Sequence, residues 1–315
     1  MKKYFALAAV ATMFAACTNE EVIPQVDALT GMPIQVKTNV AKMVDSRVAG
    51  MDSEADFNTF YMKMEGETNY EAKMSRESEK WVAYDIDNNS NPLNMVWTNG
   101  DAVKISAIMS GTIGWTSDSY NNGTNTVVSV YKDQSGNSYK NSDFLYMAPV
   151  DVTPDSDGSI TINFNHLMSK VRISIATGSS EDSDPVSSVK VGGTHYNRYF
   201  VPATGAWQGT FMKATEITAH ADSYKEGTSV YEAILVPQEV SAGTFAVSFT
   251  MGEKNYKWTS SEAVTLESGK LYTLALQVPD NDPTGDAVIV SVNVANWPTE
   301  TVTLGDTTND VVVVE

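Results

Sequence analysis

Short runs of alternating apolar and polar residues, separated by turn signals, constrain the fold of this chain more than any other feature. Alternation with a period of two is typical of half-buried strands, and many such strands at this spacing predict β-sandwiches or open barrels. Helical periodicity is nearly absent. The sequence therefore predicts an all-β fold, with its clearest strands at residues 103–108, 126–130, 159–164, 170–175, 244–250 and 271–278.

The chain has 315 residues, enough for two domains at about 150 residues each. The run at 170–175 has the pattern of a first strand of a second sandwich, so we place the boundary a few residues before it. The expected domains are an N-terminal β-sandwich at 48–163 and a C-terminal β-sandwich at 164–315.

Residues 1–16 have the composition of a secretory signal peptide. Two lysines precede an apolar stretch of about a dozen residues, which is too short to span a bilayer. The chain's single cysteine, Cys17, follows Phe14-Ala15-Ala16, and this segment resembles a bacterial lipobox. Acylation of Cys17 would anchor the protein through more than one lipid chain. The alternative is an ordinary signal peptide with an incidental cysteine.

Residues 17–47 combine a polar tether with the first predicted strand, at 34–40. Ile34, Val36 and Val40 share one face of this strand, whereas the residues between them are mostly polar. Arg47 follows among small and polar neighbours, in a segment that we expect to be an exposed loop. Lys42 is a second basic residue nearby.

The C-terminal segment at 288–315 is rich in valine. One alternating run begins at Val288, and the chain ends with four consecutive valines before Glu315: Val311, Val312, Val313 and Val314. An apolar strand at a free end invites pairing with another chain. The segment is therefore either the last edge strand of its own sheet or a strand meant for another subunit.

The composition disfavours several classes of function. A net charge of −18 argues against nucleic acid as a partner, and one cysteine with three scattered histidines leaves few ligands for a metal site. No catalytic motif or phosphate-binding loop is present, so we expect neither an enzyme nor a cofactor. Six tryptophans leave open a surface that binds glycans by stacking.

Several segments together resemble the fimbrillin family, the subunits of type V pili of gut and oral Gram-negative anaerobes. They are the Trp-Thr-Asn-Gly-Asp segment at 97–105, the aromatic strand end at 144–149, the histidine-containing junction at 164–171, and two strand signatures at 233–238 and 269–274. Each segment mainly encodes turns and buried strand faces. Their shared order behind a lipobox carries the resemblance.

The resemblance implies two β-sandwich domains of transthyretin-like topology and export as an outer-membrane lipoprotein. It also implies cleavage by an arginine-specific protease, loss of the first strand, and filling of the vacated groove by a C-terminal strand of another subunit. On this sequence the resemblance places the lipid on Cys17 and the cut after Arg47. The lost strand is the one with Ile34, Val36 and Val40. The donor lies between Val288 and the end of the chain, and Val311–Val314 is preferred.

The expected partners are other copies of the chain or related pilus subunits, the protease, the outer membrane before processing, and host protein or glycan ligands. The expected location is the cell surface, first as a lipoprotein precursor and then in a fimbrium. The alternative is a surface lipoprotein of the same fold that does not polymerise, and that anchors the pilus or binds glycans.

Overall fold

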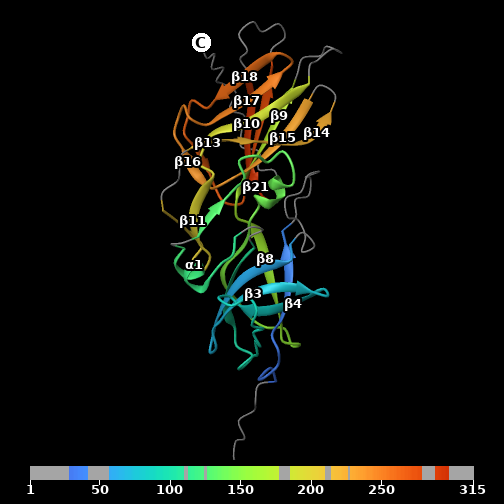
Figure 1. Ribbon diagram of the computed structural model, residues 1–315, viewed down its shortest axis with the longest axis vertical. Coiled ribbons are helices and arrows are strands. Elements are labelled where there is room, and N and C mark those ends of the chain that lie inside the picture. The colour runs from blue at the N-terminus through green and yellow to red at the C-terminus, as the bar shows by residue number, and fades with distance from the viewer. Residues whose placement is uncertain are drawn as a thin grey trace, which may run out of the picture.

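The protein is an elongated all-β molecule (Figure 1). The structure is a computed structural model, and it describes residues 28–41, 57–109, 113–123, 126–176, 185–209, 214–225, 228–278 and 288–297. No helix in these ranges is long and apolar enough to cross a membrane.

The N-terminal half is built on one seven-stranded sheet with the order β1-β8-β7-β5-β2-β3-β4. Its first and last strands, β1 and β4, contact each other, so the sheet folds round a core of its own. The strands are β1 (Gln35–Val40), β2 (Thr59–Glu65), β3 (Tyr70–Glu77), β4 (Lys80–Asp85), β5 (Val103–Met109), β7 (Leu145–Val152) and β8 (Ser159–His166).

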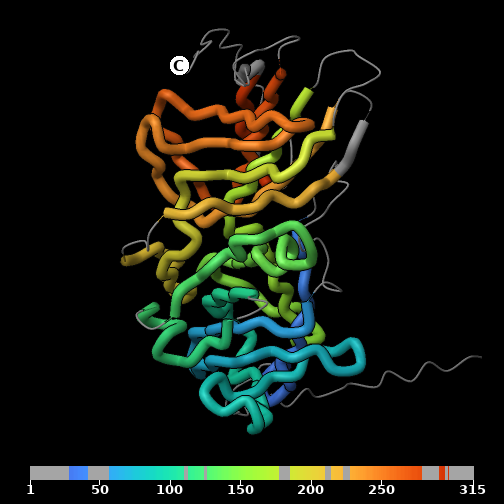
Figure 2. Tube along the Cα trace, turned by 45° about the horizontal axis from the view of Figure 1, so that its top comes forward, coloured from blue at the N-terminus to red at the C-terminus, as the bar shows by residue number. Residues whose placement is uncertain are grey.

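Two larger sheets and a two-stranded ladder form the C-terminal half (Figure 2). The five-stranded sheet contains β14 (His220–Lys225), β15 (Thr228–Leu235), β9 (Ser169–Ala176), β20 (Lys270–Gln277) and β21 (Val288–Asn296), in that order. The four-stranded sheet contains β13 (Thr215–Thr218), β10 (Val186–Thr194), β17 (Ala246–Met251) and β18 (Lys254–Thr259). The ladder joins β16 (Gln238–Val240) to β19 (Val264–Leu266).

The chain between β5 and β7 crosses from the first half to the second. It carries α1 (Ser117–Asn122), β6 (Val127–Ser129) and α2 (Ser138–Asn141), and β6 forms a three-stranded sheet with β11 (Asn197–Val201) and β12 (Ala206–Gln208). Trp115 and Tyr120 belong to the same hydrophobic core as Phe249 and Leu274. The two-domain division at 163/164 stays a prediction.

The predicted strands are confirmed to within a few residues, because their alternating pattern matches the burial. In β8, Ile160, Ile162 and Phe164 are buried, whereas Asn163 and Asn165 between and beside them are exposed. The first strand begins at Gln35 rather than Ile34, although Ile34 is buried. The all-β prediction is likewise confirmed.

Both short helices lack a hydrophobic period and were not predicted. Helix α1 begins instead at a capping box. The Thr116 hydroxyl accepts a hydrogen bond from Ser119 N–H, and the Ser119 hydroxyl accepts one from Thr116 N–H. It ends at Gly123, whose φ of 65° is the left-handed conformation that favours glycine.

Candidate functional site

The first strand is held at the edge of the N-terminal sheet along its whole length. β1 runs parallel to β8, in a register from Gln35 opposite Ser159 to Val40 opposite Phe164. The residues just before β1 pair on the other side, with the segment that contains Trp97. Ile34 N–H donates to Met95 O at 3.0 Å, and Trp97 N–H donates to Met32 O at 2.9 Å.

The inner face of this strand fills the core of the N-terminal half. Ile34 and Val40 are buried, and Val36 is half-buried against the same hydrophobic cluster as Ile160 and Phe164 of β8. The structure thus brings together the three aliphatic residues predicted for this face. Removing β1 would uncover one edge of β8 and part of the core.

The outer face of β1 carries one charged anchor. Lys37 Nζ donates to Ser159 Oγ at 2.7 Å and lies 3.6 Å from Asp157 and 3.8 Å from Asp155. The pKa of Asp157 is lowered, mainly by hydrogen bonds from Ser159 and to a smaller extent by the charge of Lys37. Since these groups are exposed, the ion pairs contribute little stability.

Trp97, in the segment that resembles a fimbrillin motif, closes the base of the first strand. Its Nε1–H donates to Gly158 O at 2.9 Å, in the turn that leads into β8. Gly158 has a φ of 75°, which favours glycine, and a Cβ there would lie 3.3 Å from Trp97 Nε1. Glycine thus allows Trp97, the start of β1 and the start of β8 to meet.

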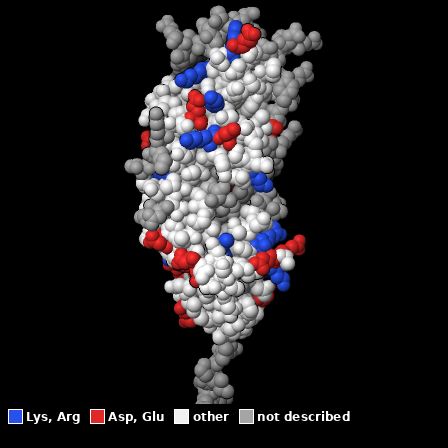
Figure 3. All heavy atoms as spheres, in the orientation of Figure 1, with Lys and Arg blue, Asp and Glu red and all other residues white. Residues whose placement is uncertain are grey.

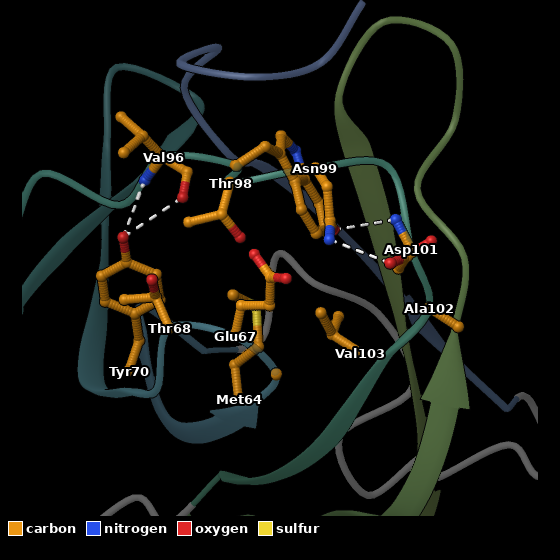
Figure 4. A pocket seen from close by; sticks show the side chains of 12 residues that line it. Met64, Glu67, Thr68, Tyr70, Val96, Thr98, Asn99, Asp101, Ala102 and Val103 are labelled. Atoms are coloured by element: carbon orange, nitrogen blue, oxygen red, sulfur yellow. Dashed lines mark hydrogen bonds between the residues drawn. The ribbon is translucent and has the colours of Figure 1, made fainter. Parts of the chain in front are cut away.

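A pocket lies beside Trp97, between this motif and the β2–β3 turn (Figure 4). The Tyr70 hydroxyl contacts both Val96 N and Val96 O at 3.2 Å, and Asn99 Nδ2 donates to Asp101 at 2.9 Å. These bonds order the turn that the motif encodes.

A buried group of charged residues lies where the two halves meet, and sequence reasoning missed it. Lys170 Nζ lies 2.6 Å from Glu232, with both side chains fully buried, and Arg172 contacts the other oxygen of Glu232 at 2.7 Å. The Tyr139 hydroxyl donates to Glu232, and burial raises the pKa of Tyr139 well above its usual value. The alternating pattern of β9 gave no signal for these partners, because they come from distant segments.

The histidine of the predicted junction segment belongs to the same region. His166 Nδ1 lies 2.8 Å from Asp143, and its ring stacks on Trp297 at 4.1 Å between centroids. Trp297 N–H donates to Gly269 O, which ties the end of β21 to this junction. His166 therefore has a packing role between the two halves.

All six tryptophans are buried or half-buried, which leaves little exposed ring surface for stacking on a glycan. Trp97, Trp115 and Trp297 are buried. The other three are half-buried and each packs against a phenylalanine: Trp81 on Phe60, Trp207 on Phe200 and Trp258 on Phe245.

The described residues contain no group of three or more His, Cys, Asp or Glu side chains that could hold a metal ion. On the face in Figure 3, basic and acidic side chains lie near each other, and the basic ones do not gather into a patch. Cys17, Arg47 and Val311–Val314 lie outside the described residues, so the predictions for them stay predictions.

The fold and this edge-strand site define an all-β protein whose N-terminal strand completes its first sheet. A family model described as fimbrillin-like matches residues 89–297, which is about two thirds of the chain. The chain belongs to the fimbrillin-like family. None of the curated proteins matches it.

The solved structures that share its fold include two from Bacteroides species. One is a candidate cell adhesion protein from Bacteroides ovatus, with a TM-score of 0.64 and 16% identity. The match covers 86% of this chain and 99% of the Bacteroides ovatus chain. The other is a candidate cell adhesion protein from Bacteroides uniformis, with a TM-score of 0.55 and 15% identity. This match covers 86% of this chain and 100% of the Bacteroides uniformis chain.

Membership of this family gives the protein a coarse function. Fimbrillin-like proteins are structural proteins of pili and adhesion at the cell surface, and they are not enzymes. The chain is thus a pilus-related adhesion protein that assembles with related subunits.

Proposed function

We propose that the chain is a pilus subunit that polymerises by strand exchange after loss of its first strand. In this proposal it is exported as a lipoprotein acylated on Cys17 and is cut after Arg47 by an arginine-specific protease. The domains proposed for the mature subunit are those at 48–163 and 164–315.

The position of β1 carries the proposal. β1 lies at one end of the sheet order and bonds β8 along six register pairs. While the chain is intact, β1 is tethered to β2 and rebinds at a high effective concentration. A cut between them removes this advantage, so that a strand from another molecule can compete for the same edge.

The hydrophobic contribution favours a filled groove. Burial of Ile34 and Val40 stabilises the domain by about 1.5–3 kcal/mol each. A strand that restores main-chain pairing with β8 and refills these positions recovers that contribution, which is the principle of β-strand addition. Because donation from head to tail does not close on itself, it builds a filament.

The donor in this proposal lies in the C-terminal segment of a neighbouring subunit, which begins at Val288. Its first part, β21, pairs with β20 of its own chain, so the donor is the part that follows β21. Val311, Val312, Val313 and Val314 remain the preferred donor residues. The segment contains no basic residue, and its four acidic residues are Glu300, Asp306, Asp310 and Glu315. Its apolar content suits a groove whose core contains aliphatic, aromatic and methionine side chains.

The test begins with the intact mass of the protein taken from its native cell surface. A lipid-free chain that begins at Val48 supports processing, whereas a chain that begins at acylated Cys17 supports the alternative of an anchoring or glycan-binding lipoprotein. Arg76 is a useful internal reference, because it lies within the paired strand β3 and we expect no cut there.

The second step treats the purified full chain with an arginine-specific protease. We expect filaments in electron micrographs after cleavage of the natural sequence and monomers from Arg47→Ala. Removal of residues 311–315 from the cleaved chain should leave a folded monomer. Filaments formed without those residues would exclude Val311–Val314 as the donor, and filaments from uncut protein would exclude the whole proposal.

A further inference from the structure

The hairpin formed by β7 and β8 is only partly closed. Each strand has eight residues, yet the pairing between them is confined to Leu145 with His166 and Tyr146 with Asn165. Beyond these pairs the strands diverge, and a cleft lies between them.

The divergence has a cause in β7. This strand stays with β5 as far as Val152, and the ladder between β5 and β7 contains an irregularity after Met147. Pro149 lies in that irregularity and has no N–H to give to a neighbouring strand. β7 therefore follows β5 away from β8.

The second edge of β8 is left open by this divergence. Gly158 O and Phe164 O accept bonds from the chain of β1, so the even-numbered main-chain groups of β8 face β1. The odd-numbered groups, at Thr161 and Asn163, face the cleft. Asn163 N–H meets only the weak acceptor Met147 Sδ, at 3.3 Å, and within the described residues Thr161 has no ladder partner on β7.

The side chains round the cleft add apolar surface and negative charge. Val150 is 48% exposed, one of three large hydrophobic residues that the described chain leaves exposed. Asp151 and Asp155 line the cleft, and no lysine or arginine is among its lining residues. The nearest ion pair is that of Asp155 with Lys37 of β1, at 3.8 Å between two exposed side chains.

We propose that the cleft between β7 and β8 binds an extended, basic segment of a partner protein by β-strand addition. The segment pairs with the open edge of β8 at Thr161 and Asn163, places an apolar side chain on Val150, and sets its positive charges near Asp151 and Asp155. This site uses the main-chain edge of β8 opposite to β1, but it shares Asp155 with the contact of Lys37 on β1, so loss of β1 would leave Asp155 to the segment.

The test uses the intact full chain and defined probes. One probe is a labelled heptapeptide with lysines at positions one and seven, valines at positions three and five, and threonines at positions two, four and six. The second probe carries glutamates in place of the lysines. We expect saturable binding of the lysine peptide by fluorescence anisotropy, and slower hydrogen exchange of the Thr161 and Asn163 amides in its presence.

Variants at exposed positions separate the apolar contribution to peptide binding from the contribution of charge, and they leave the buried core unchanged. Val150→Ser should weaken binding of the lysine peptide by at least about fivefold, because it removes the apolar contact and adds no charge. The matched control is Val292→Ser, which alters a valine that is also 48% exposed, on β21, and should leave binding within about twofold. Asp151→Lys should lower affinity for the lysine peptide and raise it for the glutamate peptide.

Three results would overturn the proposal. The first is absence of binding by the lysine peptide. The second is binding that leaves the Thr161 and Asn163 amides unprotected or that Val150→Ser does not change. The third is a change of the protein's own oligomeric state with Val150→Ser, which would mean that a second copy, and not a basic segment, occupies the cleft.

Discussion

Two glutamine side chains act as strand partners at the scale of single residues. Gln134 Nε2 donates to Ile234 O and Gln134 Oε1 accepts from Ile234 N–H, both at 2.8 Å. Gln238 forms the same pair of bonds with His195. No local pattern could reveal these contacts, because Ile234 lies one hundred residues from Gln134 in the sequence.

Replacing Gln134 with leucine should lower the free energy of unfolding by about 2 kcal/mol, because it leaves a buried donor and a buried acceptor of Ile234 without partners. Urea denaturation measures the change. Gln208→Leu, at an exposed position, is the control and should alter stability by less than about 0.5 kcal/mol. Equal effects of the two changes would contradict this role for Gln134.

Asp222 provides a second prediction at this scale, since partial burial and the nearby charge of Glu232 raise its pKa above 3.8. An acid whose pKa is higher in the folded protein than in the unfolded chain lowers the free energy of unfolding at pH values above the folded pKa. This destabilisation disappears as the pH falls toward the pKa of the unfolded chain. Asp222→Asn should therefore raise the melting temperature at pH 7, and the difference should shrink in acid. A variant that melts lower at pH 7 would contradict the prediction.

At the scale of elements, most strands were predictable and their partners were not. β8 and β20 follow from alternation, because one face of each is buried in a core. Their pairing with β1 and β9 is parallel, between segments far apart in the chain, and no local signal specifies it. The inner face of β1 was predicted correctly, whereas its contact through Lys37 was not, since the partners lie in the turn before β8.

Salt should accelerate the proposed self-assembly. Exchange removes Lys37 from Asp155 and Asp157 and brings in a C-terminal segment that has acidic residues and no basic one. Salt screens the resulting repulsion between exposed charges. Light scattering after cleavage should show faster growth at 0.5 M than at 0.05 M sodium chloride. A rate that falls with salt would argue that a basic donor from another subunit fills this groove.

At the scale of the whole molecule, a segment from the N-terminal half of the sequence packs into the C-terminal half, so a boundary at 163/164 separates residues that contact each other. The segment 113–143 comes from the first half of the sequence, yet β6 pairs with β11 and Tyr139 bonds Glu232. Tyr146 of β7 also donates to Pro202 O at 2.9 Å. The sequence predicted two sandwiches from length and strand spacing, but hydrophobic periodicity cannot tell which sheet a short strand joins.

The isolated chain 164–315 should therefore fold poorly. It lacks β6, Gln134 and Tyr139, so β11, Ile234 and Glu232 each lose a partner. We expect a broad thermal transition by circular dichroism and rapid proteolysis. The chain 113–315 restores all three partners and should melt more cooperatively. If 164–315 unfolds as sharply as the full chain, the shared segment is not needed for the second half.

The direction of β1 has a mechanical consequence. β1 and β8 run close to the long axis of the molecule (Figure 1), with six residue pairs in register. Tension along that axis would pull a strand in this position lengthwise against β8, so that its hydrogen bonds resist together in shear. A strand set across the axis would be peeled off one bond at a time. An attachment built on this geometry would resist flow in proportion to the length of the shared strand.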